Sequence, residues 1–394
     1  MFSSRVPGDL TPNALTVALK AIRARGEAVL DLTASNPTRA GFDYPPDLLT
    51  PLAYARGLAY SPEPLGLRHA RQAVVSEFAR RGRRVDPDTI ALTASTSEAY
   101  SLLFKVLCNA GDEVLIPRPS YPLFEHLTQL DLVTAVPYDL EYHAGWAIDV
   151  ASLKAALTPR TRAVLVVSPN NPTGHFISPA ELALLADLSA GRNIALISDE
   201  VFADYPLAPD ASEQAGRLTD RDDVLGFTLG GLSKAIGLPQ AKLAWIAISG
   251  PDAVVREARS RLELICDTYL SVSTPLQDAL GDLLARGQTV REQILARITA
   301  NHRALQSASR SAPACDLLRA DGGWYAVLRV PSLMSEDDLV LSLLSEDRVL
   351  VHPGYFFDFQ HESFLIVSLL PPAEVFLQGT SRILNRFASV RDPR

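Results

Sequence analysis

The 394-residue chain contains few cysteines and no long apolar run. Its three cysteines, Cys108, Cys266 and Cys315, are odd in number and lack the spacing of metal ligands. Neither a disulfide framework nor a metal site is therefore expected. The apolar runs are too short to cross a bilayer, and the N-terminal residues lack the apolar core of a signal peptide. These absences favour a protein of the reducing cytoplasm that has no membrane as its partner.

The chain is also short of positive charge, with 37 Lys and Arg against 45 Asp and Glu and a formal net charge of −8. The charges form no long run of one sign, which argues against nucleic acid as the main partner. Hydrophobic residues make up 47% and charged residues 21%, as in ordinary globular proteins. The length is sufficient for two domains.

Short apolar segments alternate with helical patterns through the middle of the chain. Strands are expected at residues 90–93, 113–117, 134–137, 163–168, 194–199, 224–229 and 243–249. Several are continuous apolar runs, which are typical of buried parallel strands. We predict a large α/β domain over residues 46–285, with a mostly parallel seven-stranded sheet flanked by helices.

The pattern changes after about residue 250, where long helical stretches precede short strands and helices. The first forty or so residues do not fit the main sheet either. We therefore predict a smaller α+β domain made from both chain ends, residues 1–45 and 286–394.

Polar side chains follow two of the first predicted strands, where parallel sheets bind ligands. Ser95, Thr96 and Ser97 open a helix, and free backbone N–H groups at such a turn suit a phosphate. The same residues also describe a helix cap, with Glu98 three positions after Ser95. Tyr121, in a proline-rich loop, is placed to stack on a flat ring or to pack as an ordinary loop aromatic.

Three more candidates follow later strands. Asn171 offers an amide from a loop that also reads as a plain turn. Asp199 ends a buried strand, where a carboxylate must be paired or solvated, and it suits either a protonated ring nitrogen or a helix N-terminus. Lys234 follows Gly230 and Gly231, and a lysine among small residues at the mouth of a sheet is a candidate for a Schiff base, although most lysines are solvated. Together these groups match the needs of a pyridoxal phosphate site.

On these residues the chain resembles the class I/II aminotransferases, the aspartate aminotransferase-like pyridoxal-phosphate enzymes of fold type I. The likeness covers roughly residues 25–390 and rests on an ordered combination: Asn-Asn-Pro-Thr-Gly, then Ser-Asp-Glu about thirty residues later, then Leu-Ser-Lys-x-x-Gly-Leu-Pro. It implies a pyridoxal-phosphate-dependent transferase fold, pyridoxal 5′-phosphate as cofactor, and transfer of an amino group between an amino acid and a 2-oxo acid.

The resemblance also implies a role for each candidate. Lys234 would carry the cofactor as a Schiff base and shuttle the proton, Asp199 would pair with the ring nitrogen, Asn171 would bond the ring hydroxyl oxygen, and Tyr121 would stack on the ring. The residues implied to hold the phosphate are Ser95, Thr96, Ser97, Ser233 and Lys242, with Tyr60 reaching it from the other subunit. A homodimer with shared sites is therefore expected.

Four positions depart from the family pattern. Phe202 stands where the family usually has tyrosine, and Gly231 where it often has serine. Lys242 replaces an arginine, which keeps the charge but loses the bidentate fork. Ile366 falls at the position of the arginine that binds the substrate carboxylate, and an apolar side chain cannot pair a carboxylate.

Other residues are candidates to replace that arginine. Arg39 is favoured, because in the family its loop lines the substrate cleft, and Tyr355 is a further candidate, with His352 and Arg329 behind them. The apolar residues and the aromatic cluster at 355–357 suggest a less polar cleft than an aspartate-specific enzyme needs.

Two alternatives to an aminotransferase stay open on sequence alone. A β-eliminating carbon–sulfur lyase would use the same lysine and aspartate. A non-catalytic pyridoxal-phosphate-binding protein on this fold would explain the lost arginine.

Overall fold

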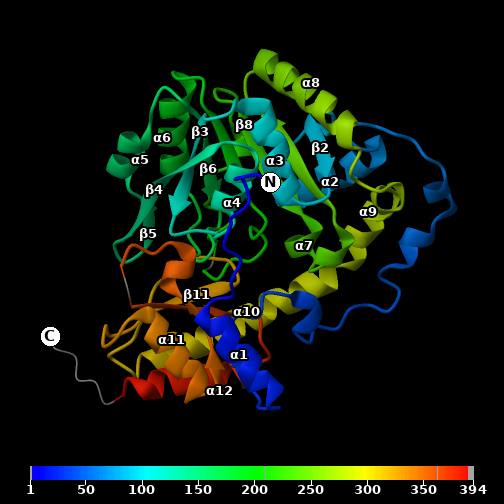
Figure 1. Ribbon diagram of the computed structural model, residues 1–394. Coiled ribbons are helices and arrows are strands. Elements are labelled where there is room, and N and C mark those ends of the chain that lie inside the picture. The colour runs from blue at the N-terminus through cyan, green and yellow to red at the C-terminus, as the bar shows by residue number, and fades with distance from the viewer. Residues whose placement is uncertain (1, 209, 362, 389–394) are drawn as a thin grey trace.

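The computed structural model describes residues 2–208, 210–361 and 363–388. Within these residues, an eight-stranded sheet forms the centre of the larger part of the molecule, in the order β2-β9-β8-β7-β6-β3-β4-β5 (Figure 1). Its strands are β2 (Ile90–Thr93), β3 (Glu113–Arg118), β4 (Thr134–Tyr142), β5 (Trp146–Ile148), β6 (Thr161–Val167), β7 (Ala195–Asp199), β8 (Gly226–Gly231) and β9 (Ala244–Ser249).

The sheet is mostly parallel, as predicted. Strands β4, β3, β6, β7 and β8 pair in parallel, whereas β2 and β9 join one side antiparallel and β5 joins the other. The eighth strand corrects the predicted count of seven. It is missed in the sequence because β5 has three residues, too few for a hydrophobic pattern, and because it pairs with the part of β4 beyond the expected strand.

Helices cover both faces of this sheet, and the alternation along β6 shows it. Ala163, Leu165 and Val167 pack with α3 and α8, whereas Val164 and Val166 pack with α5 and α6. Each face is therefore a separate apolar core. The helices of this part are α2 (Arg68–Arg80), α3 (Thr96–Leu107), α4 (Phe124–Leu130), α5 (Val150–Ala156), α6 (Pro179–Ala190), α7 (Leu232–Ala235), α8 (Asp252–Tyr269) and α9 (Thr274–Arg286).

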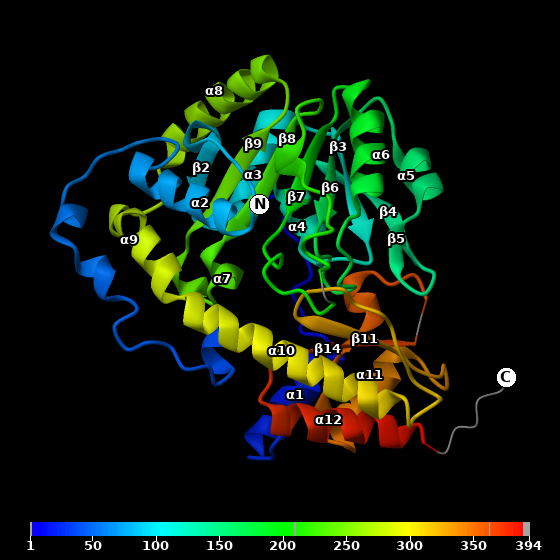
Figure 2. The same cartoon turned by 180° about the vertical axis from the view of Figure 1, so that it is seen from behind.

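Both chain ends contribute to a smaller α+β part, which lies below the main sheet in Figure 2. Four strands pair antiparallel in the order β10-β11-β14-β13, and β1 pairs in parallel with β12. The strands are β1 (Leu30–Asp31), β10 (Asp316–Leu317), β11 (Tyr325–Arg329), β12 (Val349–Leu350), β13 (His352–Pro353) and β14 (Phe364–Ser368), and the helices are α1 (Ala14–Ala24), α10 (Gln288–Ser309), α11 (Glu336–Ser345) and α12 (Ala373–Arg386).

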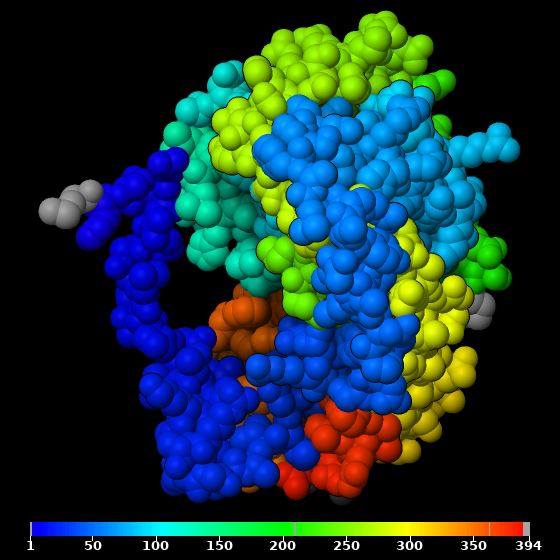
Figure 3. Space-filling view, turned by 90° about the vertical axis from the view of Figure 1, so that its right-hand side faces the viewer, coloured from blue at the N-terminus to red at the C-terminus, as the bar shows by residue number. Residues whose placement is uncertain are grey.

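The pairing of β1 with β12 places the N-terminal segment beside the C-terminal third of the chain. The exact boundaries at residues 46 and 285 stay a prediction, and residues 389–394 of the predicted small domain lie outside the described part. Figure 3 shows the first residues as an arm along one side of the molecule and the chain after β1 running over its outer surface towards α2. No helix in the described ranges combines the length and apolar character that a bilayer span requires.

Candidate active site

The carboxyl ends of β6, β7 and β8 and the first turn of α3 surround one cavity of about 270 Å³. It lies where parallel α/β sheets place their ligands. The sequence candidates that line it are Ser95, Thr96, Ser97, Tyr121, Asn171, Asp199, Ser233 and Lys234. Tertiary structure adds lining residues that sequence reasoning missed, namely Ser35, Tyr100, Phe124 and Tyr325.

Lys234 lies in the short helix α7, directly after β8. Its Nζ lies 4.9 Å from the ring centroid of Trp324 and 5.6 Å from that of Phe202. Burial lowers the pKa of the lysine to about 8, and the charge of Asp199 opposes this shift only in part. A lysine whose ammonium form is disfavoured in this way is a better nucleophile and a better base near neutral pH.

Asp199 is the last residue of β7 and is buried. Its Oδ2 accepts a hydrogen bond of 2.6 Å from the hydroxyl of Tyr100, and its Oδ1 accepts one of 3.0 Å from the backbone N–H of Val201. Burial raises the pKa of this carboxyl in spite of both bonds. A cationic group in the cavity would relieve that unfavourable burial.

The side chain of Asn171 contains a buried oxygen atom, Oδ1, without a hydrogen-bond partner among the described residues. The loop around it is braced, because the side chain of Asn170 accepts from the hydroxyl of Thr173 at 2.9 Å and donates to that of Ser120 at 3.3 Å. A buried polar atom that is held in place and unpaired usually awaits a ligand or a water molecule.

The hydroxyl-rich turn begins α3. Ser95 is the N-cap, and its Oγ accepts a hydrogen bond of 3.1 Å from the backbone N–H of Glu98. The helix-cap interpretation is therefore confirmed. It is compatible with an anion site, because Thr96 and Ser97 still face the cavity at the positive end of a twelve-residue helix.

Comparison with known proteins decides the family. The model of aminotransferase class I and II matches residues 28–375. The chain belongs to this aminotransferase family. The alanine aminotransferase of Mycobacterium tuberculosis strain H37Rv is 31% identical over 94% of this chain and 88% of that protein. The glutamate-pyruvate aminotransferase AlaA of Escherichia coli K12 is 28% identical over 93% of both chains.

Solved structures show the same fold. An aminotransferase from Escherichia coli matches with a TM-score of 0.86 and 24% identity, covering 100% of this chain and 99% of that one. An alanine aminotransferase from Pyrococcus furiosus matches with a TM-score of 0.86 and 23% identity, covering 98% and 99%. The sequence resemblance and its predicted fold are confirmed, and the chain is an enzyme of the amino-group-transferring class.

Two of the departures from the aminotransferase pattern have a packing reason. At Gly231 a Cβ atom would lie 2.9 Å from the Cβ of Ala244 on the paired strand β9, so the serine that the resemblance suggests here does not fit without a shift. Phe202 packs edge-on against Trp324 with ring centroids 5.3 Å apart, which places an apolar ring where the resemblance suggests a phenol.

The structure does not place the other sequence candidates at the cavity. Ile366 is fully buried in the core of the small domain, opposite Val327, and the hydroxyl of Tyr355 donates to Asp337 at 2.7 Å. Arg39 is exposed at the end of a short 3-10 turn, whereas Ser35 of the same loop lines the cavity. None of these three residues lines the cavity within the described part of the chain, and their part in substrate binding stays a prediction.

Neither of the two more distant phosphate candidates lines the cavity. Lys242 is exposed in a left-handed conformation with φ 53°. Tyr60 is 75% exposed and lines a separate surface cavity together with Tyr269 and Leu270. Arg329, a further candidate to replace the carboxylate-binding arginine, pairs with Asp316 on the outside of the small domain.

Proposed function

We propose that this aminotransferase binds pyridoxal 5′-phosphate covalently at Lys234 and acts on α-amino acids with small or apolar side chains. The observation that carries the proposal is the meeting of three groups in one buried cavity: a lysine with a lowered pKa, a buried carboxylate and an unpaired amide oxygen. Three separate strand ends supply them.

The cavity fits the cofactor group by group. The Asp199 carboxylate suits a protonated pyridine nitrogen, and the Asn171 amide suits the ring hydroxyl. The first turn of α3, with Thr96 and Ser97, suits the phosphate. Tyr121 lines the same cavity and is available to cover the ring face.

Pyridoxal phosphate supplies an electron sink for the charge left when a proton leaves the α-carbon of the substrate. The chain's own residues do the rest. Lys234 Nζ, neutral in a large share of molecules near its pKa of about 8, accepts and returns that proton. Asp199 holds a proton on the ring nitrogen by its negative charge, and Tyr100 orients the carboxylate through its 2.6 Å hydrogen bond. The packed rings of Phe202 and Trp324 exclude water around the lysine.

The walls of the cavity support a small or apolar substrate side chain. Among the described residues, Lys234 is the one cation that lines it, and the aromatic rings of Tyr121, Phe124, Phe202 and Tyr325 form much of the wall. A second carboxylate on the substrate would find no guanidinium from this chain. We infer that the α-carboxylate is met by neutral donors, with the Ser35 and Tyr325 hydroxyls as the first candidates. The relative named as an alanine aminotransferase supports a small substrate side chain. The relative named as a glutamate-pyruvate aminotransferase supports it only for the pyruvate partner.

A panel of amino donors tests the proposal. The purified protein, loaded with pyridoxal phosphate, is mixed with alanine, glutamate, aspartate or phenylalanine, first without and then with a 2-oxo acid. We expect the visible absorbance of the cofactor to fall when alanine is added and to return when an oxo acid follows. Neither change should occur in Lys234→Ala. Full turnover by Lys234→Ala would overturn the role of the lysine. Release of pyruvate from a β-substituted amino acid, with no oxo acid present, would identify an eliminating lyase instead.

We further propose a cytoplasmic homodimer in which Tyr60 completes the site of the second subunit. The exposure of Tyr60, on the segment that runs over the outer surface, supports this (Figure 3). The free thiols of the three cysteines support a reducing compartment. Mixing the inactive Lys234→Ala protein with a weakened Tyr60→Ala protein would restore activity, because a hybrid dimer contains one intact site. Failure to restore it, in a sample shown to hold hybrid dimers, would contradict shared sites.

A further inference from the structure

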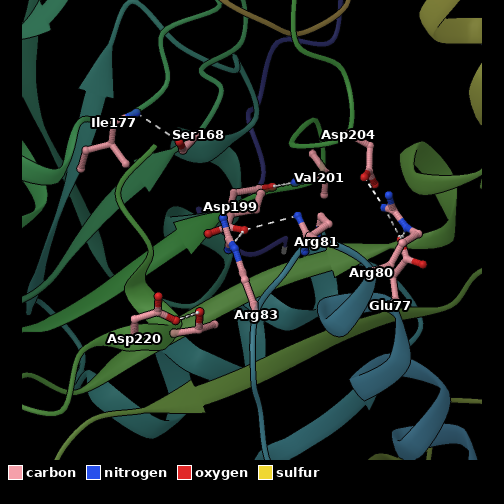
Figure 4. Close-up of polar contacts among 12 residues, drawn as sticks. Glu77, Arg80, Arg81, Arg83, Ser168, Ile177, Asp199, Val201, Asp204 and Asp220 are labelled. Carbon is pink, nitrogen blue, oxygen red and sulfur yellow. Dashed lines mark hydrogen bonds and ion pairs between the residues drawn. The ribbon is translucent and has the colours of Figure 1, made fainter. Parts of the chain in front are cut away.

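A second cavity, of about 590 Å³, lies beyond the candidate active site at the C-terminal end of α2. The turn after β7 and the segment at 212–217 form its other sides. Four arginines line it: Arg80, Arg81, Arg83 and Arg217. Figure 4 shows three of them gathered from the end of α2, with Arg80 directed at Glu77 and Asp204.

Carboxylates neutralise part of this cluster. Arg83 pairs with Glu200, and Arg80 pairs with both Glu77 and Asp204. Asp204 also faces Arg291 at 3.9 Å from behind the cavity. Glu213 is a second carboxylate on the lining and is exposed.

Two of the arginines keep unused donors. The Nε of Arg81 is buried and has no hydrogen-bond partner among the described residues. Its guanidinium lies 5.2 Å from the ring of Phe78 and reaches Glu200 at 3.5 Å, which is a long contact for an ion pair. The guanidinium of Arg81 is therefore incompletely paired, which is unfavourable for a charged side chain that is only 13% exposed and favours an additional acceptor at its terminal N–H groups.

Arg217 is the second such arginine. Within the described ranges it forms no ion pair with a carboxylate, and its one hydrogen bond is a 3.5 Å contact with the carbonyl of Gly82. Arginines also surround the carboxylate of Asp204. Burial raises the pKa of this carboxyl, but Arg81, Arg291 and Arg80 together outweigh burial and hold it below its usual value.

We propose that this cavity is an anion site that binds a phosphate dianion, with Arg81 and Arg217 as its principal donors. Guanidinium groups present paired N–H donors that match phosphate oxygens. The proposal is independent of the reaction and of the cofactor, because none of these arginines lines the candidate active site.

Calorimetric titration tests the site. The protein is first saturated with pyridoxal phosphate, so that its active-site phosphate position is filled, and is held at constant ionic strength in a phosphate-free chloride buffer. Inorganic phosphate is the first probe. Glycerol 3-phosphate is the second, and it distinguishes free phosphate from a phosphate monoester as the natural occupant. We expect one phosphate per chain in addition to the cofactor.

Three variants decide the assignment. Arg217→Gln and Arg81→Gln should each weaken phosphate binding about tenfold or more, since each removes charged hydrogen bonds. Arg256→Gln, at an exposed arginine of α8, should leave the affinity unchanged. Arg217 makes no ion pair within the described residues, so its variant tests the proposal even if Arg81→Gln loses stability.

The proposal is overturned if the wild type shows no phosphate binding beyond its cofactor. It is equally overturned if Arg217→Gln binds as tightly as the wild type, or if Arg256→Gln weakens binding to the same extent. Unchanged transaminase activity in any of these proteins does not bear on the result, because the readout is the binding heat alone.

Discussion

The hydroxyl of Tyr100 lies 2.6 Å from Oδ2 of Asp199, and both side chains are buried. Tyr100 belongs to α3, the helix whose first turn presents Ser95, Thr96 and Ser97 to the same cavity. One rigid helix therefore sets both the proposed phosphate end and the proposed ring-nitrogen end of the site. Its register relative to β7 controls the distance between them.

Replacing Tyr100 by phenylalanine removes a hydrogen bond to the charged form of Asp199. Such bonds contribute roughly 1.5–3 kcal/mol, so we expect the pKa of Asp199 to rise further and kcat/KM to fall about tenfold or more. The acid limb of the pH–rate profile should move to higher pH, because Asp199 acts as a carboxylate. Tyr138→Phe is the matched control, since this buried hydroxyl donates to the carbonyl of Leu165 away from the cavity. An unchanged acid limb in Tyr100→Phe would contradict the role.

Lys234 predicts a pH-dependent stability in the cofactor-free protein. Its folded pKa of about 8 lies below the usual value of 10.5, so between these pH values the unfolded chain binds more protons and stability rises with pH. The corresponding destabilisation at pH 7 is about 3 kcal/mol. Lys234→Met should therefore be more stable than the wild type at pH 7, with a difference that shrinks towards pH 10.5.

Denaturant unfolding of the cofactor-free proteins between pH 7 and 10 measures this difference. Lys20→Met, at an exposed lysine of α1, serves as the control and should show no such trend. If the difference in free energy of unfolding between Lys234→Met and wild type stays constant across this pH range, burial of the ammonium group is not its cause.

Gly231→Ser introduces the residue that the sequence resemblance suggests at this position. The added Cβ would lie 2.9 Å from that of Ala244, so we expect the free energy of unfolding to fall by about 1–3 kcal/mol. Adding Ala244→Gly should recover part of the loss, because it removes the opposing atom. Urea unfolding of the two single variants and the double variant measures the coupling. Purely additive losses would rule out the contact between these two positions as the reason.

Phe202→Tyr introduces the phenol that the sequence resemblance suggests at this position. Phe202 lines the cavity, so an added hydroxyl is expected to gain one hydrogen bond with the cofactor and to tighten its binding about fivefold, in line with roughly 1 kcal/mol for such a bond. Equilibrium dialysis of pyridoxal phosphate measures it. Phe356→Tyr, at a 41% exposed ring outside the cavity, should bind the cofactor as the wild type does. Equal or weaker binding by Phe202→Tyr would refute the predicted contact.

The residues that meet in the candidate cavity could be predicted from sequence because each stands at or shortly after the end of a buried strand. Lys234, Asp199 and Asn171 stand at or after the ends of three strands with apolar sequences, and parallel pairing brings such positions to one edge of a sheet. Local pattern determined the mostly parallel sheet in the same way. The short strand β5 escaped because three residues carry no readable period.

Only the tertiary structure decided the contacts between segments that share no local sequence pattern. Ser35 and Tyr325 reach the cavity from opposite ends of the chain, and Tyr100 meets Asp199 across the sheet. Packing also buries Ile366 in the core. Its position in a sequence motif does not reveal which way its side chain faces. The arginine cavity likewise exists only because folding brings Arg217 to the end of α2. Sequence determines which chemistry is available, whereas long-range packing determines which groups meet, since burial and partner distance depend on the whole fold.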